Sequence, residues 1–302
     1  MSERIVPVAN LDAALAEHAA QGFRLDMIMP ADAPRTALIS RGGERLRLVA
    51  PHQSPPETDT QAFVITRASG EAWSAGRAGM QYRDLIPGRC GGRFIASHIR
   101  IERGGPVADY VHHHAIRFQM IYCRRGWVRV VYEDQGPPFV MHEGDCVLQP
   151  PHIRHRVLES SPGLEVIEVA SPAEHETWRD HALELPTATI DRERLYEGQR
   201  FVRHIAADAP RGPIRDTGIA AATNGLAGAR VIALPRDETY GHEKTGAFLF
   251  LAILKGSLTL EAQGTHTLAS DDACSLPAGT AFAMRALEDA AFLEVRLPLT
   301  TA

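Results

Sequence analysis

The chain of 302 residues is 44% hydrophobic and 23% charged, and its net charge of −5 gives no basic footprint for nucleic acid or an anionic membrane surface. No apolar run approaches the length of a membrane span and the first residues lack a signal-peptide pattern, so we expect a cytoplasmic protein. Its four widely spaced cysteines form no CxxC pair and are expected to be buried thiols, not disulfides.

The N-terminal segment predicts one helix followed by short strands. Asn10 precedes LDAALAEHAAQGF, whose apolar residues recur at helical spacing, so Asn10 is the expected N-cap and Gly22 the expected end. Three following segments alternate in polarity between turn sequences and predict strands: 23–29, 36–40 and 45–49. Residues 51–60 are polar and proline-rich and predict a linker, so we assign residues 1–60 to a short α/β extension.

Most of the remaining chain consists of short strand-like segments between turn sequences, a rhythm typical of a β-sandwich or β-barrel. Residues 173–214 differ, because much of this stretch is polar, charged and interrupted by prolines, and they are expected to link two domains. We therefore predict an all-β fold with one barrel at 61–172 and a second at 215–302.

An internal repeat supports two copies of one barrel. YVHHHAIRFQMIYCRRGWVRV aligns with YGHEKTGAFLFLAILKGSLTL, so that His112 meets His242. Downstream, GDCVLQPPHIRHRV aligns with DDACSLPAGTAFAM, so that Pro150 meets Pro277. Two barrels of the same architecture explain both alignments.

Three histidines of the first predicted barrel form a candidate metal site. His112 and His114 lie two residues apart in a strand-like segment, so their side chains share one face, whereas His113 points outward. The turn-forming Pro150–Pro151 pair leads to His155 on a returning strand. Three imidazoles suit Fe(II), Mn(II), Ni(II), Co(II) or Zn(II), while Ca(II) and Mg(II) prefer oxygen ligands. The alternative is a solvated histidine cluster that binds no ion.

These segments resemble the two motifs of the cupin superfamily. The first motif is met at His112, His114, Gln119 and Gly126, with its leading glycine displaced, and the second at Gly144, Pro150 and His155. His152 stands where the second motif usually has a glycine. The resemblance covers residues 93–170 well and 217–297 weakly. It implies a bicupin, a chain of two jelly-roll barrels, with one intact metal-binding domain.

Gln119 stands where the cupin motif usually has an acidic metal ligand. As a fourth ligand it offers a neutral carbonyl oxygen, which leaves the ion its full +2 charge and favours anionic, chelating molecules. If Gln119 does not bind, a three-histidine site keeps open positions for substrate, water or O2. The resemblance allows both arrangements: three-histidine cupins include diketone- and thiol-cleaving dioxygenases, and some sugar-phosphate isomerases of this fold use a glutamine ligand to zinc.

The second predicted barrel has lost the site. The positions aligned with the ligands are His242, Lys244, Leu249 and Phe282. One histidine beside a lysine and two apolar side chains cannot hold a divalent ion. We expect this half to brace the first barrel or mediate assembly, with a pocket for an organic ligand as the alternative.

Other side chains near the histidines are candidates for catalysis. Tyr110 and Arg117 flank the ligand strand, and Arg117 could pair with a substrate carboxylate or remain a charge on the barrel rim. Glu168 could turn inward and hydrogen-bond a ligand imidazole, unless the other face of its strand points inward. Ile121 and Cys123 share a face with Gln119 and predict a mostly apolar wall.

The leading functional hypothesis is a metal-dependent cupin enzyme for a small organic anion, an Fe(II) dioxygenase-type oxidoreductase, with iron favoured over Mn, Ni and Zn. The alternatives are a non-oxidative isomerase or lyase using Zn, Ni or Mn, and a non-catalytic metabolite-binding cupin. We expect a small anionic substrate as the ligand and neither nucleic acid nor membrane as a partner. Exposed strand edges would allow a homodimer as well as a monomer.

Overall fold

The computed structural model describes residues 3–51, 63–70, 73–243, 245–246 and 248–297, so the predicted linker at 51–60 lies almost entirely outside the described residues. Within these ranges the strands form five sheets, and no helix is long and apolar enough to cross a membrane. The described helical segments are short: α1 (Leu11–Ala20), α2 (Arg89–Gly92), α3 (Ile219–Ala222) and the 3-10 turns η1 (Arg77–Gly79) and η2 (Ala206–Asp208).

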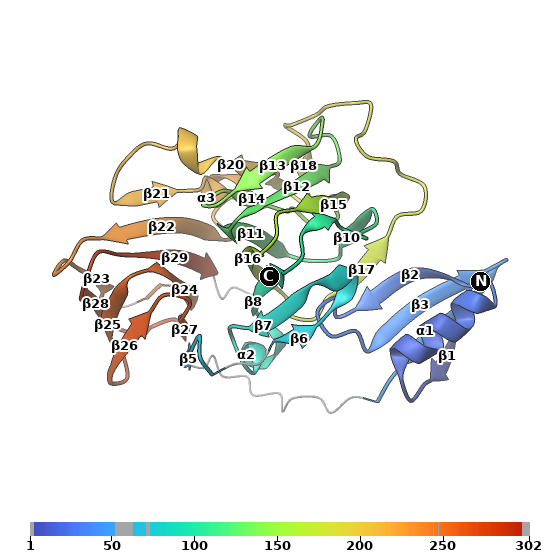
Figure 1. Cartoon of the computed structure of the whole chain (residues 1–302), viewed down its shortest axis with the longest axis horizontal. Coiled ribbons are helices and arrows are strands. Elements are labelled where there is room, and N and C mark those ends of the chain that lie inside the picture. Colours follow the sequence, from blue (N-terminus) through green and yellow to red (C-terminus); the bar gives the residue numbers. More distant parts are fainter. Residues whose placement is uncertain (1–2, 52–62, 71–72, 244, 247, 298–302) are drawn as a thin grey trace.

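The N-terminal unit packs α1 against a small sheet. The side-chain oxygen of Asn10 accepts a hydrogen bond from the backbone N–H of Ala13 at 2.9 Å, which confirms the predicted cap. Its strands are β1 (Glu3–Pro7), β4 (Glu44–Val49), β3 (Thr36–Arg41) and β2 (Arg24–Met29), in that order across the sheet. Because β2 pairs with β17 (Thr177–Arg179), this unit continues a sheet of the neighbouring unit (Figure 1).

The central unit contains two sheets, and the histidine-rich segments form strands of the first. The first sheet continues from β17 through β10 (His112–His114), β15 (His155–Ser160), β12 (Trp127–Tyr132) and β13 (Phe139–His142), with β9 (Gly105–Pro106) beside β15. The second runs in the order β20 (Val202–His204), β14 (Cys146–Leu148), β11 (Phe118–Arg125), β16 (Leu164–Ser171), β8 (Ile95–Ile101), β7 (Gln81–Asp84) and β6 (Ser74–Ala75).

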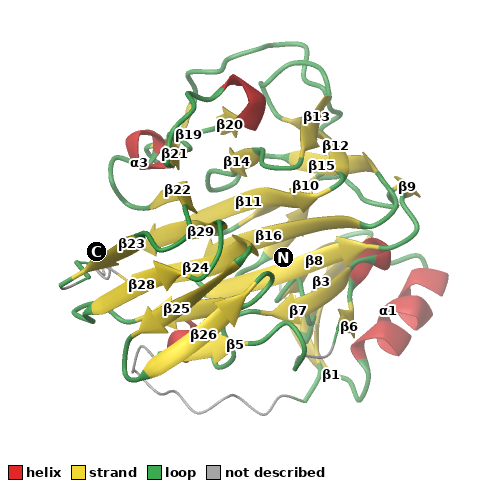
Figure 2. Cartoon of the chain, turned by 60° about the vertical axis from the view of Figure 1, so that its left-hand side comes forward, coloured by secondary structure: helices red, strands yellow, loops and turns green. Residues whose placement is uncertain are grey.

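The C-terminal unit repeats this arrangement (Figure 2). One sheet has the order β21 (Ile214–Asp216), β22 (Gly228–Leu234), β29 (Ala290–Leu297), β24 (Phe248–Lys255), β27 (Ala273–Leu276) and β5 (Val64–Thr66). The other has β23 (Thr239–His242), β28 (Phe282–Ala286), β25 (Ser257–Glu261) and β26 (Thr265–Ala269). His242 pairs with Phe282 just as His112 pairs with His155, so the repeat in sequence is also a repeat in space. A small hairpin of β18 (Leu195–Tyr196) and β19 (Gln199–Arg200) lies in the connection between the units.

Two edge strands lie outside the unit to which the sequence assigned them. β5, expected in the first barrel, pairs with β27 of the C-terminal unit, and β20, expected in the linker, pairs with β14 of the central unit. Each has only three residues. A pattern of that length specifies which side chains share a face and carries no information about the neighbouring strand.

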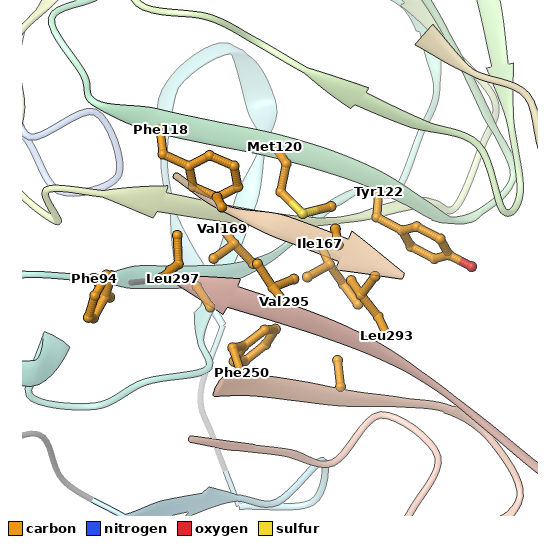
Figure 3. Close-up of a cluster of buried hydrophobic side chains, with 14 of the residues drawn as sticks. Phe94, Phe118, Met120, Tyr122, Ile167, Val169, Phe250, Leu293, Val295 and Leu297 are labelled. Carbon is orange, nitrogen blue, oxygen red and sulfur yellow. The ribbon is translucent and has the colours of Figure 1, made fainter. Parts of the chain in front are cut away.

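A hydrophobic core joins the central and C-terminal units (Figure 3). The rings of Phe94 and Phe248 stack across it with their centroids 4.4 Å apart. β11 contributes every second residue to this core: Phe118, Met120 and Tyr122. Because side chains alternate along a strand, Gln119 on the same strand points the other way, into the central unit.

Candidate metal centre

His112, His114 and His155 lie together inside the central unit. Their side chains are 1%, 6% and 6% exposed, and a ligand nitrogen from each lies within 4.8 Å of the others. The antiparallel pairing of β10 with β15 sets His112 directly opposite His155, and the two-residue spacing sets His114 on the same face. Among the described residues this is the one cluster of histidine, cysteine and carboxylate side chains that converges tightly enough to hold a metal ion.

Hydrogen bonds orient all three rings toward a common centre. Nδ1 of His112 lies 2.8 Å from the carbonyl oxygen of Tyr110, and Nδ1 of His155 lies 3.0 Å from that of Ile153. Because a carbonyl oxygen only accepts, each of these Nδ1 atoms carries a hydrogen, and in the neutral ring the Nε2 atom then holds the lone pair that a metal ion binds. The hydroxyl of Thr177, 2.9 Å from Nδ1 of His114, can play the same part. Such bonds commonly orient metal-binding histidines.

Gln119 lines the same cavity as the three histidines. Its side chain is 3% exposed, and its amide nitrogen donates a hydrogen bond to Oε1 of Glu168 at 2.9 Å. This bond sets the orientation of the amide, and the carbonyl oxygen of Gln119 is left buried without a hydrogen-bond partner. Leaving a buried acceptor unpaired costs about 1–3 kcal/mol, which binding of a cation would offset. The three converging imidazoles fit a divalent transition metal, and the unpaired Gln119 oxygen lies in the wall of the same cavity.

The predicted catalytic candidates occupy three different environments. Glu168 faces the cavity and orients Gln119, so the inward-facing side of β16 is the one that carries Glu168. Arg117 is exposed. The ring of Tyr110 packs under the guanidinium of Arg179, 4.6 Å from the ring centroid, while its backbone carbonyl orients His112. Neither Tyr110 nor Arg117 is among the described residues that line the cavity, although the ring of Tyr110 lies edge-on to that of His112 with centroids 5.7 Å apart, so a catalytic role for either stays a prediction.

The histidines open into a cavity of about 110 Å³ between the two sheets. Much of its wall is apolar, including Ile99, Ile121, Val130, Met141 and Val166. The polar side chains of the wall include Gln119, Gln149, Arg156 and Glu168, in addition to the histidines. The cavity therefore combines a polar end for an anionic group with a wall that excludes water, as small-molecule sites commonly do.

Sequence reasoning missed two contributors to this cavity. Asp32 comes from the N-terminal unit, and His175 follows β16. Neither lies in a recognised motif, and the only signal in the sequence was the unusually large number of histidines. The N-terminal unit thus forms part of the cavity wall, which its position in the sequence did not indicate.

The C-terminal unit has an ion network in place of a metal centre. Glu294 is fully buried and accepts hydrogen bonds from the hydroxyl of Tyr240 at 2.6 Å and from Nε of Arg230 and of Arg296, both at 2.8 Å. Glu294 lies opposite Arg230, as Glu168 lies opposite Ser97 in the central unit. The guanidinium groups of Arg230 and Arg296 supply positive charge beside the carboxylate of Glu294.

The aligned ligand positions agree with this interpretation. His242 bonds to the guanidinium of Arg296 at 3.2 Å, and Leu249 and Phe282 are buried in the unit's own apolar core. Lys244, the fourth aligned position, lies outside the described residues. No group of metal ligands forms in the described part of this unit.

No protein-family model matches the chain, and no curated protein sequence does. Many solved structures are similar to it. Protein Ylba from E. coli matches with a TM-score of 0.60 and 12% identity, over 80% of this chain and 93% of the other. An oxalate decarboxylase from Bacillus subtilis matches with 0.58 and 11%, over 82% and 81%, and one from Lactobacillus farciminis with 0.60 and 11%, over 80% and 88%. These are cupin-fold proteins, so the predicted cupin fold is confirmed.

Proposed function

We propose that this chain is a metal-dependent enzyme acting on a small organic anion, and that His112, His114, His155 and Gln119 hold one divalent transition metal. The observation that carries the proposal is the buried carbonyl oxygen of Gln119, which lacks a hydrogen-bond partner beside three converging imidazoles. A cluster formed only for packing would satisfy that oxygen internally, because buried polar atoms are paired in most proteins.

The charge of the site supports an anionic substrate. All four proposed donors are neutral. The carboxylate of Glu168 is not one of them, because it accepts a hydrogen bond from the Gln119 amide. The ion therefore keeps most of its charge, which favours an enolate, phenolate or carboxylate ligand. The small cavity and its apolar wall limit the substrate to a compact molecule and keep bulk water away from it.

Within this class we propose an Fe(II) dioxygenase-type oxidoreductase. When bound, iron would supply Lewis acidity toward the substrate and reactivity with O2. The chain's own residues would hold the substrate at the polar end, where Gln149, 4% exposed, offers hydrogen bonds beside the histidines. Three histidines without a carboxylate ligand, in a mostly apolar cavity, are the features that favour this chemistry over others.

A metal-dependent lyase or isomerase that needs no O2 is the second candidate. It is favoured by the oxalate decarboxylases among the similar structures, since the Bacillus subtilis enzyme has Mn(II) centres. Under this proposal the same residues would hold Mn, Ni or Zn, and the substrate would be a carboxylate.

The first test is the metal content of the purified protein. We expect about one transition-metal ion per chain in the wild type and almost none in the His112→Ala/His114→Ala variant. His113→Ala is the matched control, because His113 lies on the same strand, contacts His152 and lies outside the cavity that holds the other two. Equal metal content in all three proteins, or none in the wild type after anaerobic loading with Fe(II), would contradict the proposal.

The second test separates the two chemistries. The Fe(II)-loaded protein is exposed to O2 with a panel of catechols, gentisates, β-diketones and thiols, and O2 consumption is measured. The Mn(II)-loaded protein is incubated with oxalate and other small carboxylates, and CO2 release is measured. Substrate-dependent O2 uptake supports the dioxygenase, whereas CO2 release without O2 uptake supports the lyase.

A further inference from the structure

A fourth histidine faces the cavity outside both motifs. His175 is 6% exposed and lines the cavity together with His114, whose ring centroid lies 5.3 Å from its own at an interplanar angle of 79°. It is not a member of the cluster whose nitrogens converge for a metal ion. Its segment is anchored, because the backbone N–H of Ala173 donates to the carbonyl of Gly92 at 2.9 Å.

The hydrogen bonds of His175 leave one acceptor atom for a ligand. Nδ1 lies 3.0 Å from the carbonyl oxygen of Pro172, so Nδ1 carries the hydrogen and Nε2 holds a lone pair. Nε2 is buried and has no hydrogen-bond partner. Asp32, a second polar residue in this wall, already pairs with Arg89. Because His175 lines the cavity, its unpaired acceptor is available to a molecule bound there.

We propose that Nε2 of His175 accepts a hydrogen bond from the molecule bound in the cavity, and that it selects ligands bearing an O–H or N–H next to their metal-binding group. Hydroxy acids, partly ionised catechols and hydroxamic acids have this chemistry. This inference rests on the proposed function, because the metal ion is what holds the other end of the ligand. Gln119 leaves its own unpaired oxygen for the metal ion, so His175 supplies the hydrogen-bond acceptor for the ligand.

The test compares two probes that differ in one donor. Glycolate and methoxyacetate share a carboxylate and an oxygen on the next carbon, and only glycolate has the O–H. Binding of each to the Zn(II)-loaded protein is measured by titration calorimetry for the wild type and for His175→Leu. We expect the ratio of the two affinities, glycolate over methoxyacetate, to be about tenfold larger in the wild type than in His175→Leu. A factor of this size corresponds to the loss of one buried hydrogen bond. Comparing the two ratios removes the intrinsic difference between the probes.

Two controls show whether His175 itself sets this ratio. His152→Leu changes a histidine that contacts Glu197 and lies outside the cavity, and it is expected to keep the wild-type ratio. Zinc content is measured for every variant. If zinc-loaded His175→Leu keeps the wild-type preference for glycolate, the inference fails while the proposed function stands. If that variant no longer binds zinc, the inference also fails, because His175 would then be a metal ligand. A wild type that takes up no zinc overturns the proposed function and this inference together.

A readout in the wild type avoids dependence on the folding of a variant. In zinc-loaded protein with 15N-labelled histidines, the Nε2 resonance of His175 is expected to shift on addition of glycolate and to stay in place with methoxyacetate. The same response to both probes, or none to glycolate, contradicts a hydrogen bond from the ligand.

Discussion

At the scale of single residues, the charge of the proposed metal centre depends on which atom of Gln119 is free to bind an ion. Glu168 accepts a hydrogen bond from the amide nitrogen of Gln119, so the carbonyl oxygen of Gln119 is the atom left for a cation. The pair thus places a carboxylate one hydrogen bond away from the ligands, where the common cupin motif places it among them. The proposed ligand atoms are therefore all neutral, and the carboxylate of Glu168 lies one hydrogen bond away from them.

The Gln119→Glu variant tests this division of roles. In the metal-free protein it sets two carboxylates side by side and removes the amide donor, so we expect a loss of about 1–3 kcal/mol in the free energy of unfolding. Zinc should then raise the melting temperature more than it does in the wild type, because the new ligand is charged. Thermal unfolding with and without Zn(II) measures both effects.

The exchanged double variant is the control for that prediction. Gln119→Glu together with Glu168→Gln restores an amide–carboxylate pair with its direction reversed. We expect it to recover most of the stability of the metal-free protein. A double variant as unstable as Gln119→Glu alone would show that the hydrogen bond between the two side chains is not what orients Gln119.

At the scale of elements, β29 (Ala290–Leu297) of the C-terminal unit carries the buried charge of Glu294, whereas the central unit has the candidate metal site. Burial by itself raises the pKa of Glu294, but hydrogen bonds from Tyr240 and Arg296 and the charges of Arg296 and Arg230 outweigh it, so the pKa is lowered. Burial and the same carboxylate raise the pKa of Tyr240 to about 12. The network therefore holds a charged carboxylate and a neutral phenol at neutral pH.

Glu294→Gln is expected to destabilise the protein in a pH-dependent way. At pH 7 we expect a loss of about 2–3 kcal/mol, less than for a fully buried pair because Arg230 and Arg296 are partly exposed. Since the folded pKa lies below the ordinary value of 4.5, the stabilisation is present above that pH and is lost as the pH falls through the lowered pKa. Urea unfolding at pH 7 and at progressively lower pH measures the difference.

The exposed Glu288 provides the matched control in the same unit. Glu288→Gln is expected to change the free energy of unfolding by less than about 0.5 kcal/mol. If the gap between the wild type and Glu294→Gln stayed constant as the pH fell, the charge of Glu294 would not be its source.

At the scale of the whole molecule, the central and C-terminal units share one apolar core. Phe248 of β24 is fully buried, and its ring stacks on that of Phe94 of the central unit. The pairing of β5 with β27 adds a strand from the chain before the central unit to the sheet of the C-terminal one. Unfolding either unit alone would expose the apolar side chains that the other unit contributes to this core. We therefore expect the two units to unfold together.

Phe248→Ala tests that coupling. We expect it to lower the free energy of unfolding by about 3–5 kcal/mol and to leave a single transition at a lower temperature. Leu287→Ala, at a side chain that is 42% exposed, should cost less than about 0.5 kcal/mol. Calorimetry of both variants and the wild type supplies the measurement, and two separate transitions in the wild type would contradict a shared core.

The features that the sequence determined by itself are those with a short period or a fixed spacing. The alternation of strands indicated an all-β chain, and the spacing of His112 and His114, with His155 after its turn, indicated the cluster that the structure forms. The offset between the repeats aligned His242 with His112 and Phe282 with His155, and the structure pairs His242 with Phe282 as it pairs His112 with His155. These properties follow from local geometry, since side chains two apart in a strand share a face whatever surrounds them.

Only the tertiary structure decided how distant residues meet around those histidines. It turned the amide of Gln119 toward Glu168, 49 residues away, and brought His175 and Asp32 into the cavity wall. It also placed Arg117 at the surface and gave β5 to the C-terminal sheet. Each of these outcomes depends on a loop path, a side-chain rotamer or a choice of strand neighbour, and none of them has a periodic signature in the chain.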